Sequence, residues 1–443
     1  MSASDAVLSP SIGSSRGHAG VGAVYRVEIG KISAQLLPRA AFVVCALGPF
    51  AFAVFIRTQS SVPADWLFGR WVQASGFALP FLMLGFAGLA GFPVIASVVG
   101  GDIFASEDRQ STWKTVLTRS CSRGQVFVGK SLAAMTFSVA LVVVLAVCST
   151  VAGIALIGTG SLVGLSGELL EPERAGVLLA ESFALALVPT LAFTCLAIFF
   201  SVTTRNSMAG LIGAPAVAAV MVVVSLMGSG VAVRSILLTS PFEAWRGLQI
   251  PGAPAKTLWI GLIVCGAYAA LSLGAAWRTF HRRDFAGDGQ APFRWSTLRR
   301  VGVATVAVAA ILLIGALLNR TWITSSHLEA SVSRTLTNLV VVQQGLLGKE
   351  ADATALRVFP FCKRESVISG TSEGPAEDWI CQVFIDGPRV GRLVADYSIA
   401  VHPDGCYTAD APAAVVGPLR IETPDGGTAL NPLSAFDGCM IPS

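Results

Sequence analysis

The chain has 443 residues, of which 53% are hydrophobic and 13% are charged, and its mean hydropathy is +0.68. An average soluble domain carries about a quarter charged residues, so this chain cannot cover itself with polar surface and lipid must be its main solvent. The formal net charge of +4 is too small to indicate nucleic-acid binding, and the basic residues lie in the short segments that join apolar stretches. The composition excludes an ordinary soluble enzyme or nucleic-acid-binding protein.

Seven stretches of the chain lack Asp, Glu, Lys and Arg and approach or exceed the roughly 20 residues that a helix needs to cross a bilayer. In lipid every backbone N–H and C=O needs an internal partner, and each stretch is too long for a barrel strand, so we expect helices. The predicted fold class is an all-α polytopic membrane bundle, with a six-span core plus one extra span, followed by a small disulfide-stapled α+β domain. The predicted spans are 40–56, 71–101, 131–167, 182–204, 206–233, 257–277 and 301–318.

Lys and Arg gather in the N-terminal segment and in the connections after the second, fourth and sixth spans. The positive-inside rule places these segments in the cytoplasm and, after an odd number of spans, the tail outside. We therefore expect a multi-pass protein of the cell (plasma) membrane with a cytoplasmic N-terminus. The predicted parts are a disordered segment at 1–23, an amphipathic helix at 24–37 within a six-span core at 24–285, a basic linker and seventh span at 286–320, and an extracytoplasmic α+β domain at 321–443.

Cysteines support this placement of the tail, which contains Cys362, Cys381, Cys406 and Cys439. An even number of cysteines in a segment predicted to face an oxidising compartment favours two disulfides, and the sequence leaves three connectivities open. A zinc site is the alternative, but no His stands at ligand spacing, so we predict no metal. Within the tail we expect a helix at 326–347 and strands at 379–385, 393–401 and 419–423.

The octapeptide at 124–131 fits the P-loop pattern G-x-x-x-x-G-K-S. A P-loop needs a buried strand before it and a soluble helix after it, whereas Ser131 begins an uncharged span, so we interpret Lys130 as an anchor at the end of that span. No Ser/His/Asp set, catalytic cysteine or carboxylate pair stands out elsewhere. The sequence therefore predicts no catalytic site and no enzymatic activity.

The connection between the second and third spans resembles the corresponding loop of ABC-2 type ABC transporter permeases. In that family the loop runs as Glu, a gap, Gly-Thr, and a short helix that ends in Leu-Thr and Arg, with a Lys at the start of the third span. The residues here that match are Glu107, Thr112, Leu117, Thr118, Ser122, Arg123 and Lys130, together with Glu28 and Lys31 of the amphipathic helix. The resemblance extends over about residues 24–285. Two positions depart from the pattern, since Ser111 replaces Gly and Cys121 replaces Pro.

The resemblance implies a permease subunit of an ATP-binding-cassette exporter. It implies that the chain binds no cofactor itself, that ATP and Mg²⁺ enter through a separate cytoplasmic ABC ATPase subunit docked on the loop, and that a second permease subunit, identical or different, completes the pathway. The docking loop would offer short apolar side chains and rim charges. Its residues would be Glu107, Thr112, Lys114, Leu117, Thr118, Arg123 and Lys130. A solvated loop that is basic only through the positive-inside rule is the alternative.

A second class of function stays open from the sequence. The spans could anchor a sensor or an assembly factor whose extracytoplasmic domain binds a ligand or a partner. The shortness of the cytoplasmic segments speaks against this interpretation, because it leaves little sequence for an effector. The sequence does not identify a transported substrate.

Overall fold

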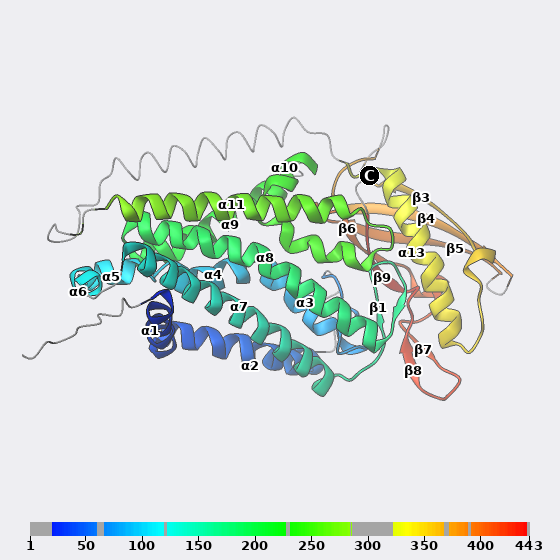
Figure 1. The fold of residues 1–443 in the computed structure, drawn as a ribbon. Helices are drawn as coiled ribbons and strands as arrows, with labels where there is room; N and C mark the ends of the chain where they lie inside the picture. The colour runs from blue at the N-terminus through cyan, green and yellow to red at the C-terminus, as the bar shows by residue number, and fades with distance from the viewer. Residues whose placement is uncertain are drawn as a thin grey trace, which may run out of the picture.

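The computed structural model describes residues 20–59, 66–118, 122–226, 231–283, 285, 322–366, 372–388 and 391–440. Within these residues six helices are long and apolar enough to cross a membrane, which indicates a membrane protein. The helices lie side by side in a bundle, and a C-terminal domain of helix and sheet lies at one end of it (Figure 1). The predicted disordered segment up to residue 19 and the predicted seventh span at 301–318 lie outside the described residues.

The predicted amphipathic helix and first span are separate helices, α1 (Val21–Ala34) and α2 (Leu36–Thr58). The amphipathic helix was predicted to extend to residue 37, but it ends at Ala34 and the break falls at Gln35, whose ψ of 144° is extended. Pro38 lies in the first turn of α2, where a missing N–H costs no helical hydrogen bond.

The second span is shorter and less regular than the prediction of 71–101. Residues 66–77 form turns and the short helix η1 (Trp71–Gln73), and the span itself comprises three consecutive pieces. One π-helical turn in its middle interrupts the α-helix, a distortion that is common at functional sites. The pieces are α3 (Ala78–Phe86), η2 (Ala87–Gly91) and α4 (Phe92–Gly100).

The third and fourth spans both begin earlier than predicted. Ser122 caps α7 (Arg123–Leu156) in a capping box with Gln125, which satisfies donors at the helix start. Pro172 begins α8 (Pro172–Thr204), where its fixed φ favours the first helical position. The third span was predicted to extend to 167, but α7 ends at Leu156, and β1 (Leu162–Val163) forms a hairpin with β2 (Leu169–Leu170).

The fifth and sixth spans are α9 (Ser207–Leu226) and α11 (Ala255–His281), and between them lie α10 (Val231–Ile236) and the 3-10 helix η3 (Ser240–Gln249). The centre of the bundle is α8, which packs against α4, α7, α9 and α11. At the end of the second span the backbone touches α9, since a Cβ added to Gly101 would lie 2.4 Å from the carbonyl oxygen of Gly210.

The C-terminal domain pairs α13 (Ser325–Leu346) with a five-stranded antiparallel sheet of order β3-β4-β5-β6-β9. The predicted helix and the three predicted strands are confirmed within α13, β4, β5 and β7, whereas β3, β6 and β9 were not predicted. The sheet strands are β3 (Arg357–Arg364), β4 (Ala376–Gly387), β5 (Gly391–Val401), β6 (Cys406–Asp410) and β9 (Ala435–Cys439). The smaller elements are η4 (Ala353–Ala355), α14 (Ala413–Val416), β7 (Arg420–Glu422) and β8 (Thr428–Leu430).

Strand pairing selects one of the three disulfide connectivities. Cys362 faces Cys381 across β3 and β4, and Cys406 faces Cys439 across β6 and β9. Both pairs are disulfides. Each bond therefore joins neighbouring strands of the same sheet, at its two outer strand pairs.

Candidate functional site

The connection between the second and third spans lies at the end of the bundle opposite the C-terminal domain (Figure 1). We call these the loop end and the domain end. The connection comprises α5 (Ala105–Arg109) and α6 (Trp113–Thr118). Its start is held by α8, because the Ser201 hydroxyl accepts hydrogen bonds from the backbone N–H groups of Phe104 at 3.2 Å and Ala105 at 3.0 Å. These are donors that a helix start leaves without a helical partner.

A cluster of four charged side chains joins this connection to two other helices. Lys130 of α7 donates hydrogen bonds to Glu28 of α1 at 2.9 Å and to Glu107 of α5 at 3.1 Å. Lys31 of α1 completes the ring, with 2.8 Å to Glu107 and 3.0 Å to Glu28. We call these four residues the charge cluster. Two carboxylates alternate with two ammonium groups, so every charge has two opposite neighbours.

Glu28, Glu107 and Lys130 of the charge cluster are buried, whereas the Lys31 side chain is 44% exposed, and Glu107 is held ionised. Lys130 is 1% exposed, and its third hydrogen bond goes to the carbonyl oxygen of Ile103 at 3.0 Å. Burial favours the neutral form of Glu107, but Lys130, Lys31 and the Thr112 hydroxyl outweigh it and lower the pKa of Glu107 to about 2. Burial also opposes charge on Lys31, yet its hydrogen bonds to the two glutamates raise the pKa of Lys31 above the ordinary value.

A second polar group ties the connection to the end of α11. Asp108 accepts hydrogen bonds from the Trp113 indole at 3.0 Å and from Arg283 at 2.9 Å. Arg123 donates to the carbonyl oxygens of His281 at 2.9 Å and Arg283 at 3.0 Å, which satisfies acceptors that the end of α11 leaves open. The connection and the start of α7 thus contact α1, α8 and the end of α11.

The structure brings only some of the predicted loop residues together. Glu107, Thr112 and Lys130 meet at the charge cluster, whereas Arg123 contacts α11. Lys114 is exposed and Leu117 is half-buried on α6, and Thr118 ends that helix. The side chain of Thr118 lies outside the described residues, as does Cys121.

The structure corrects the interpretation of Lys130 as an anchor and supports the rejection of a P-loop at residues 124–131. We interpreted Lys130 as an anchor at the end of the third span, but its ammonium group is buried in ion pairs because Glu28 and Glu107 approach it from separate helices. The P-loop-like segment 124–131 forms the first turns of α7, so its backbone N–H groups are not arranged as a phosphate-binding loop. Sequence reasoning did not identify Asp108 and Arg283, whose contact spans 175 positions and leaves no local signal.

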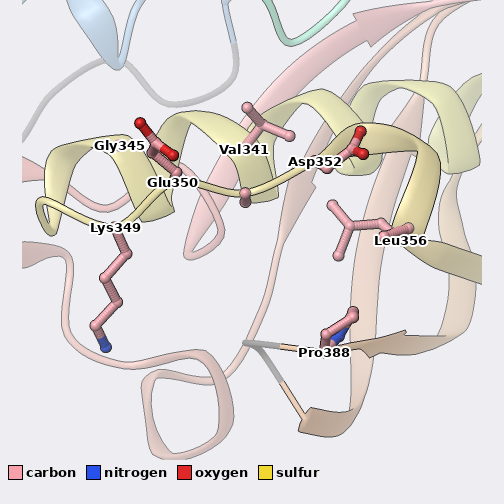
Figure 2. Close-up of a pocket in the computed structure, with 9 residues that line it drawn as sticks. Val341, Gly345, Lys349, Glu350, Asp352, Leu356 and Pro388 are labelled. Atoms are coloured by element: carbon pink, nitrogen blue, oxygen red, sulfur yellow. The ribbon is translucent and has the colours of Figure 1, made fainter.

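The C-terminal domain carries a hollow of about 640 Å³ between the end of α13 and the turn after β4. Figure 2 shows Leu356 and Pro388 on one side of it and Lys349 on the other. Val341 and Asp352 also line it, so the hollow combines apolar walls with charged side chains at its rim. Within the described part of the chain no group of three or more His, Cys, Asp or Glu side chains is placed to hold a metal ion.

Comparison with known proteins identifies relatives of the membrane bundle. The chain is 26% identical over 162 residues to "Uncharacterized protein YhcI" of Bacillus subtilis (strain 168), an alignment that covers 34% of this chain and 48% of that protein. The chain thus spans about half the length of this curated relative. A family model described as "Protein of unknown function (DUF2705)" matches residues 41–286. The match begins within the first span, includes the loop connection and the other five spans, and ends before the C-terminal domain. The chain therefore belongs to the DUF2705 family.

Proposed function

We propose that this chain is the permease subunit of an ATP-driven exporter, energised by a separate cytoplasmic ABC ATPase that docks on α6. The observation that carries the proposal is the charge cluster, in which Lys130 and both glutamates are buried. It connects the segment just before α6 to α1 and α7, so a force applied at α6 would move three elements together. An exposed loop that was basic only for reasons of topology would need no such buried ion pairs.

The surface of α6 suits a docking role in this proposal. Lys114 is exposed and Leu117 is half-buried, while Trp113 on the same short helix is buried against Phe104 at a ring distance of 6.3 Å and Phe280 at 5.3 Å. The aromatic side chain of Trp113 therefore anchors α6 to the bundle, and Lys114 and Leu117 are available to contact a partner. ATP and Mg²⁺ would be bound by that partner, and a second permease subunit would complete the pathway.

We further propose that the loop end faces the cytoplasm and that the C-terminal domain is extracytoplasmic. The concentration of Lys and Arg in the loop-end connections supports the first assignment, and the two disulfides support the second. The proposed seventh span would connect the two ends of the bundle, and the described residues on either side of it lie at opposite ends. Arg283 contacts Asp108 at the loop end, whereas Ile323 accepts a hydrogen bond from Gly374 within the C-terminal domain.

The test is co-purification from native membranes in mild detergent, comparing the natural chain with Leu117→Asp and with Leu419→Asp as the matched control. Leu419 is 55% exposed on the C-terminal domain, so the same substitution there leaves α6 unchanged. The proposal expects an ATPase that co-purifies with the natural chain and with the control and is released by Leu117→Asp. Failure to recover any ATPase, even after cross-linking, would remove the main support for transport.

The hollow beside α13 favours a second candidate function, a membrane-anchored sensor whose domain binds a ligand. Its apolar walls and charged rim fit a small amphipathic molecule. Substitution of Leu356 by Asp would place a charge in the wall. This candidate expects loss of ligand binding by the purified full chain with no effect on ATPase recovery, which separates it from the transport proposal.

A further inference from the structure

The C-terminal domain contacts every connection that the described chain has at the domain end of the bundle. Before the second span, Arg70 binds Asp410 of β6, with 2.6 Å between Nη2 and Oδ2. Between the third and fourth spans, Asn338 of α13 donates to the carbonyl oxygen of Ser166 at 2.8 Å. Between the fifth and sixth spans, η3 contacts the start of β6. The domain therefore links three connections that belong to different pairs of spans.

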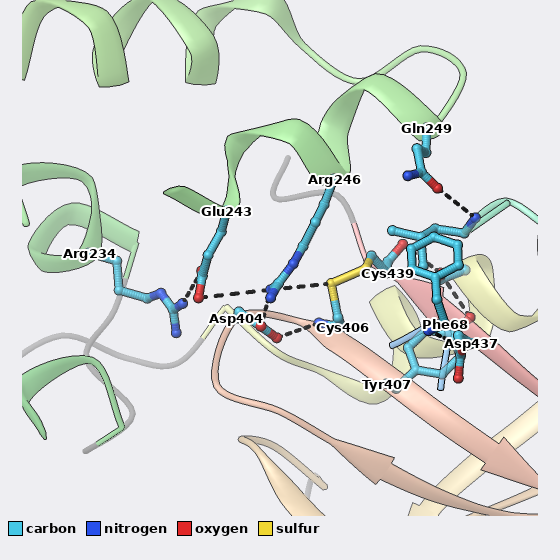
Figure 3. Close-up of a disulfide and its surroundings, with 12 residues drawn as sticks. Phe68, Arg234, Glu243, Arg246, Gln249, Asp404, Cys406, Tyr407, Asp437 and Cys439 are labelled. Atoms are coloured by element: carbon cyan, nitrogen blue, oxygen red, sulfur yellow. Dashed lines mark hydrogen bonds and ion pairs between the residues drawn. A yellow bond between two sulfur atoms is a disulfide. The ribbon is translucent and has the colours of Figure 1, made fainter. Parts of the chain in front are cut away.

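The contact with η3 is a half-buried ion pair. Figure 3 shows Arg246 reaching from η3 to Asp404, beside the disulfide of Cys406 and Cys439. Arg246 and Asp404 have side chains that are each 16% exposed. Arg246 holds the pKa of Asp404 below its usual range although burial opposes this, and Asp404 with Glu243 holds that of Arg246 above its own. This pair therefore stays charged across the physiological pH range.

A second contact before the second span joins a backbone N–H group to a buried carboxyl group. The backbone N–H of Phe68 donates to Oδ2 of Asp437 at 2.9 Å, and Phe68 has a φ of 63°, which is uncommon for a residue other than glycine. Asp437 is 5% exposed, and its Oδ1 has no hydrogen-bond partner among the described residues. The domain thus buries a carboxyl group whose second oxygen is unsatisfied, directly against a strained residue of the bundle.

Both contacts connect to the second span through stacked aromatic rings. Phe68 stacks on Phe81 of α3 at a ring distance of 5.1 Å, and Trp245 of η3 stacks on the same Phe81 at 5.5 Å. Phe242 of η3 stacks on Phe92 of α4 at 5.4 Å. The segments that the domain holds are therefore packed on both halves of the span that leads into α5.

We propose that the C-terminal domain is a pH-sensitive latch, which holds the domain end of the second span through Asp437 and releases its grip on residues 66–70 as the pH rises towards neutral. The inference is independent of the transport assignment. It follows from the burial of Asp437 against Phe68 and from the three connections that one rigid domain bridges.

Burial and the charges around Asp437 determine the direction in which its pKa shifts. Asp410 and Tyr407 face it from β6 and Arg70 from the bundle, while Arg334 of α13 acts on Tyr407. Burial is the largest influence and, with Asp410, raises the pKa of Asp437 from 3.8 to about 7, although Phe68 N–H and Arg70 oppose it. Tyr407, with a pKa raised by burial to about 12, stays neutral throughout this range.

The sign follows from comparing the docked and released states. In the released state Asp437 faces water and regains its ordinary pKa, so it ionises at lower pH than in the docked state. Docking is therefore strongest below about pH 4, weakens by up to about tenfold per pH unit above that, and reaches a constant lower level beyond about pH 7.

Hydrogen–deuterium exchange of the full chain in nanodiscs tests the proposal, with rates at residues 66–77 corrected for the intrinsic effect of pH. We expect protection to fall by more than tenfold between pH 5 and pH 7.5 in the natural chain and to change little in Asp437→Asn, which retains an acceptor for Phe68 but cannot ionise. Equal protection at both pH values, or an equal fall in Asp437→Asn, would overturn the latch.

A cross-linked variant provides a measurement that does not depend on the folding of Asp437→Asn. Ser166→Cys with Asn338→Cys would join the domain to the bundle at the connection between the third and fourth spans, a different contact from that of Asp437 with Phe68. Once oxidised, this variant should keep residues 66–77 protected at pH 7.5, whereas Ser166→Cys alone, which cannot form the cross-link, should keep the pH dependence of the natural chain. If the cross-linked protein loses protection like the natural chain, the change is local and the domain does not act as a latch.

Discussion

Lys130 and Glu107 form a buried ion pair at 3.1 Å although 23 positions separate them, and each also contacts a residue of α1. The pair joins α5, in the first half of the connection that follows the second span, to the N-terminal part of the third span. Removing one partner from such a cluster leaves uncompensated charge in a site from which water is excluded.

Lys130→Met should therefore destabilise the protein by about 3–5 kcal/mol, the usual cost of breaking a buried ion pair. The midpoint of thermal unfolding in detergent measures the effect. Lys114→Met removes the same charge from the exposed surface of α6 and should shift the midpoint little. Equal shifts in the two variants would show that the charge cluster does not stabilise the loop end.

The charge cluster should also be sensitive to acid. The pKa of Glu107 is lowered to about 2 from an ordinary value of 4.5, so its contribution to stability is fully present above about pH 4.5 and is lost as the pH falls towards 2. Melting temperatures measured between pH 6 and pH 3 should fall more steeply for the natural chain than for Glu107→Gln. Parallel curves would mean that Glu107 does not titrate differently in the folded state.

The close backbone contact between the second and fifth spans predicts that adding one methyl group at Gly210 destabilises the protein. A Cβ on Gly210 would lie 2.0 Å from the carbonyl oxygen of Gly101, so Gly210→Ala must push the helices apart and should cost about 1–3 kcal/mol. Gly48→Ala in α2 is the matched control, since a Cβ there meets nothing within 4 Å, and it should be neutral or slightly stabilising. A neutral Gly210→Ala variant, judged by the same melting assay, would contradict the close packing.

The disulfide of Cys406 and Cys439 should stabilise the C-terminal domain through the unfolded chain. The two cysteines are 33 positions apart, and loop closure of that length corresponds to about 3–4 kcal/mol in the chain-entropy description. Replacing both by Ser should lower the unfolding midpoint of the domain under oxidising conditions and remove its dependence on reductant at this site. An unchanged midpoint would indicate that strand pairing alone suffices.

The number of membrane helices in the described bundle could be predicted because length and absence of charge are local properties. Their ends could not, since the early starts of α7 and α8 depend on Ser122 and Pro172 as helix-capping residues rather than on hydropathy. Likewise β3, β6 and β9 were not predicted, because they acquire their identity as strands from pairing with neighbours rather than from their own composition.

The sequence by itself therefore determined that this chain is a membrane protein, that its spans are helices, and that a cysteine-containing α+β tail follows them. It could do so because burial of apolar residues and backbone hydrogen bonding in lipid act on contiguous segments. Only the tertiary structure decided which cysteines pair, that Lys130 is enclosed by Glu28 and Glu107, and that Asp437 is buried against Phe68. Each of these depends on the approach of residues distant in the chain. Their contact energies arise only when separate helices and strands pack together, and no local pattern encodes that approach.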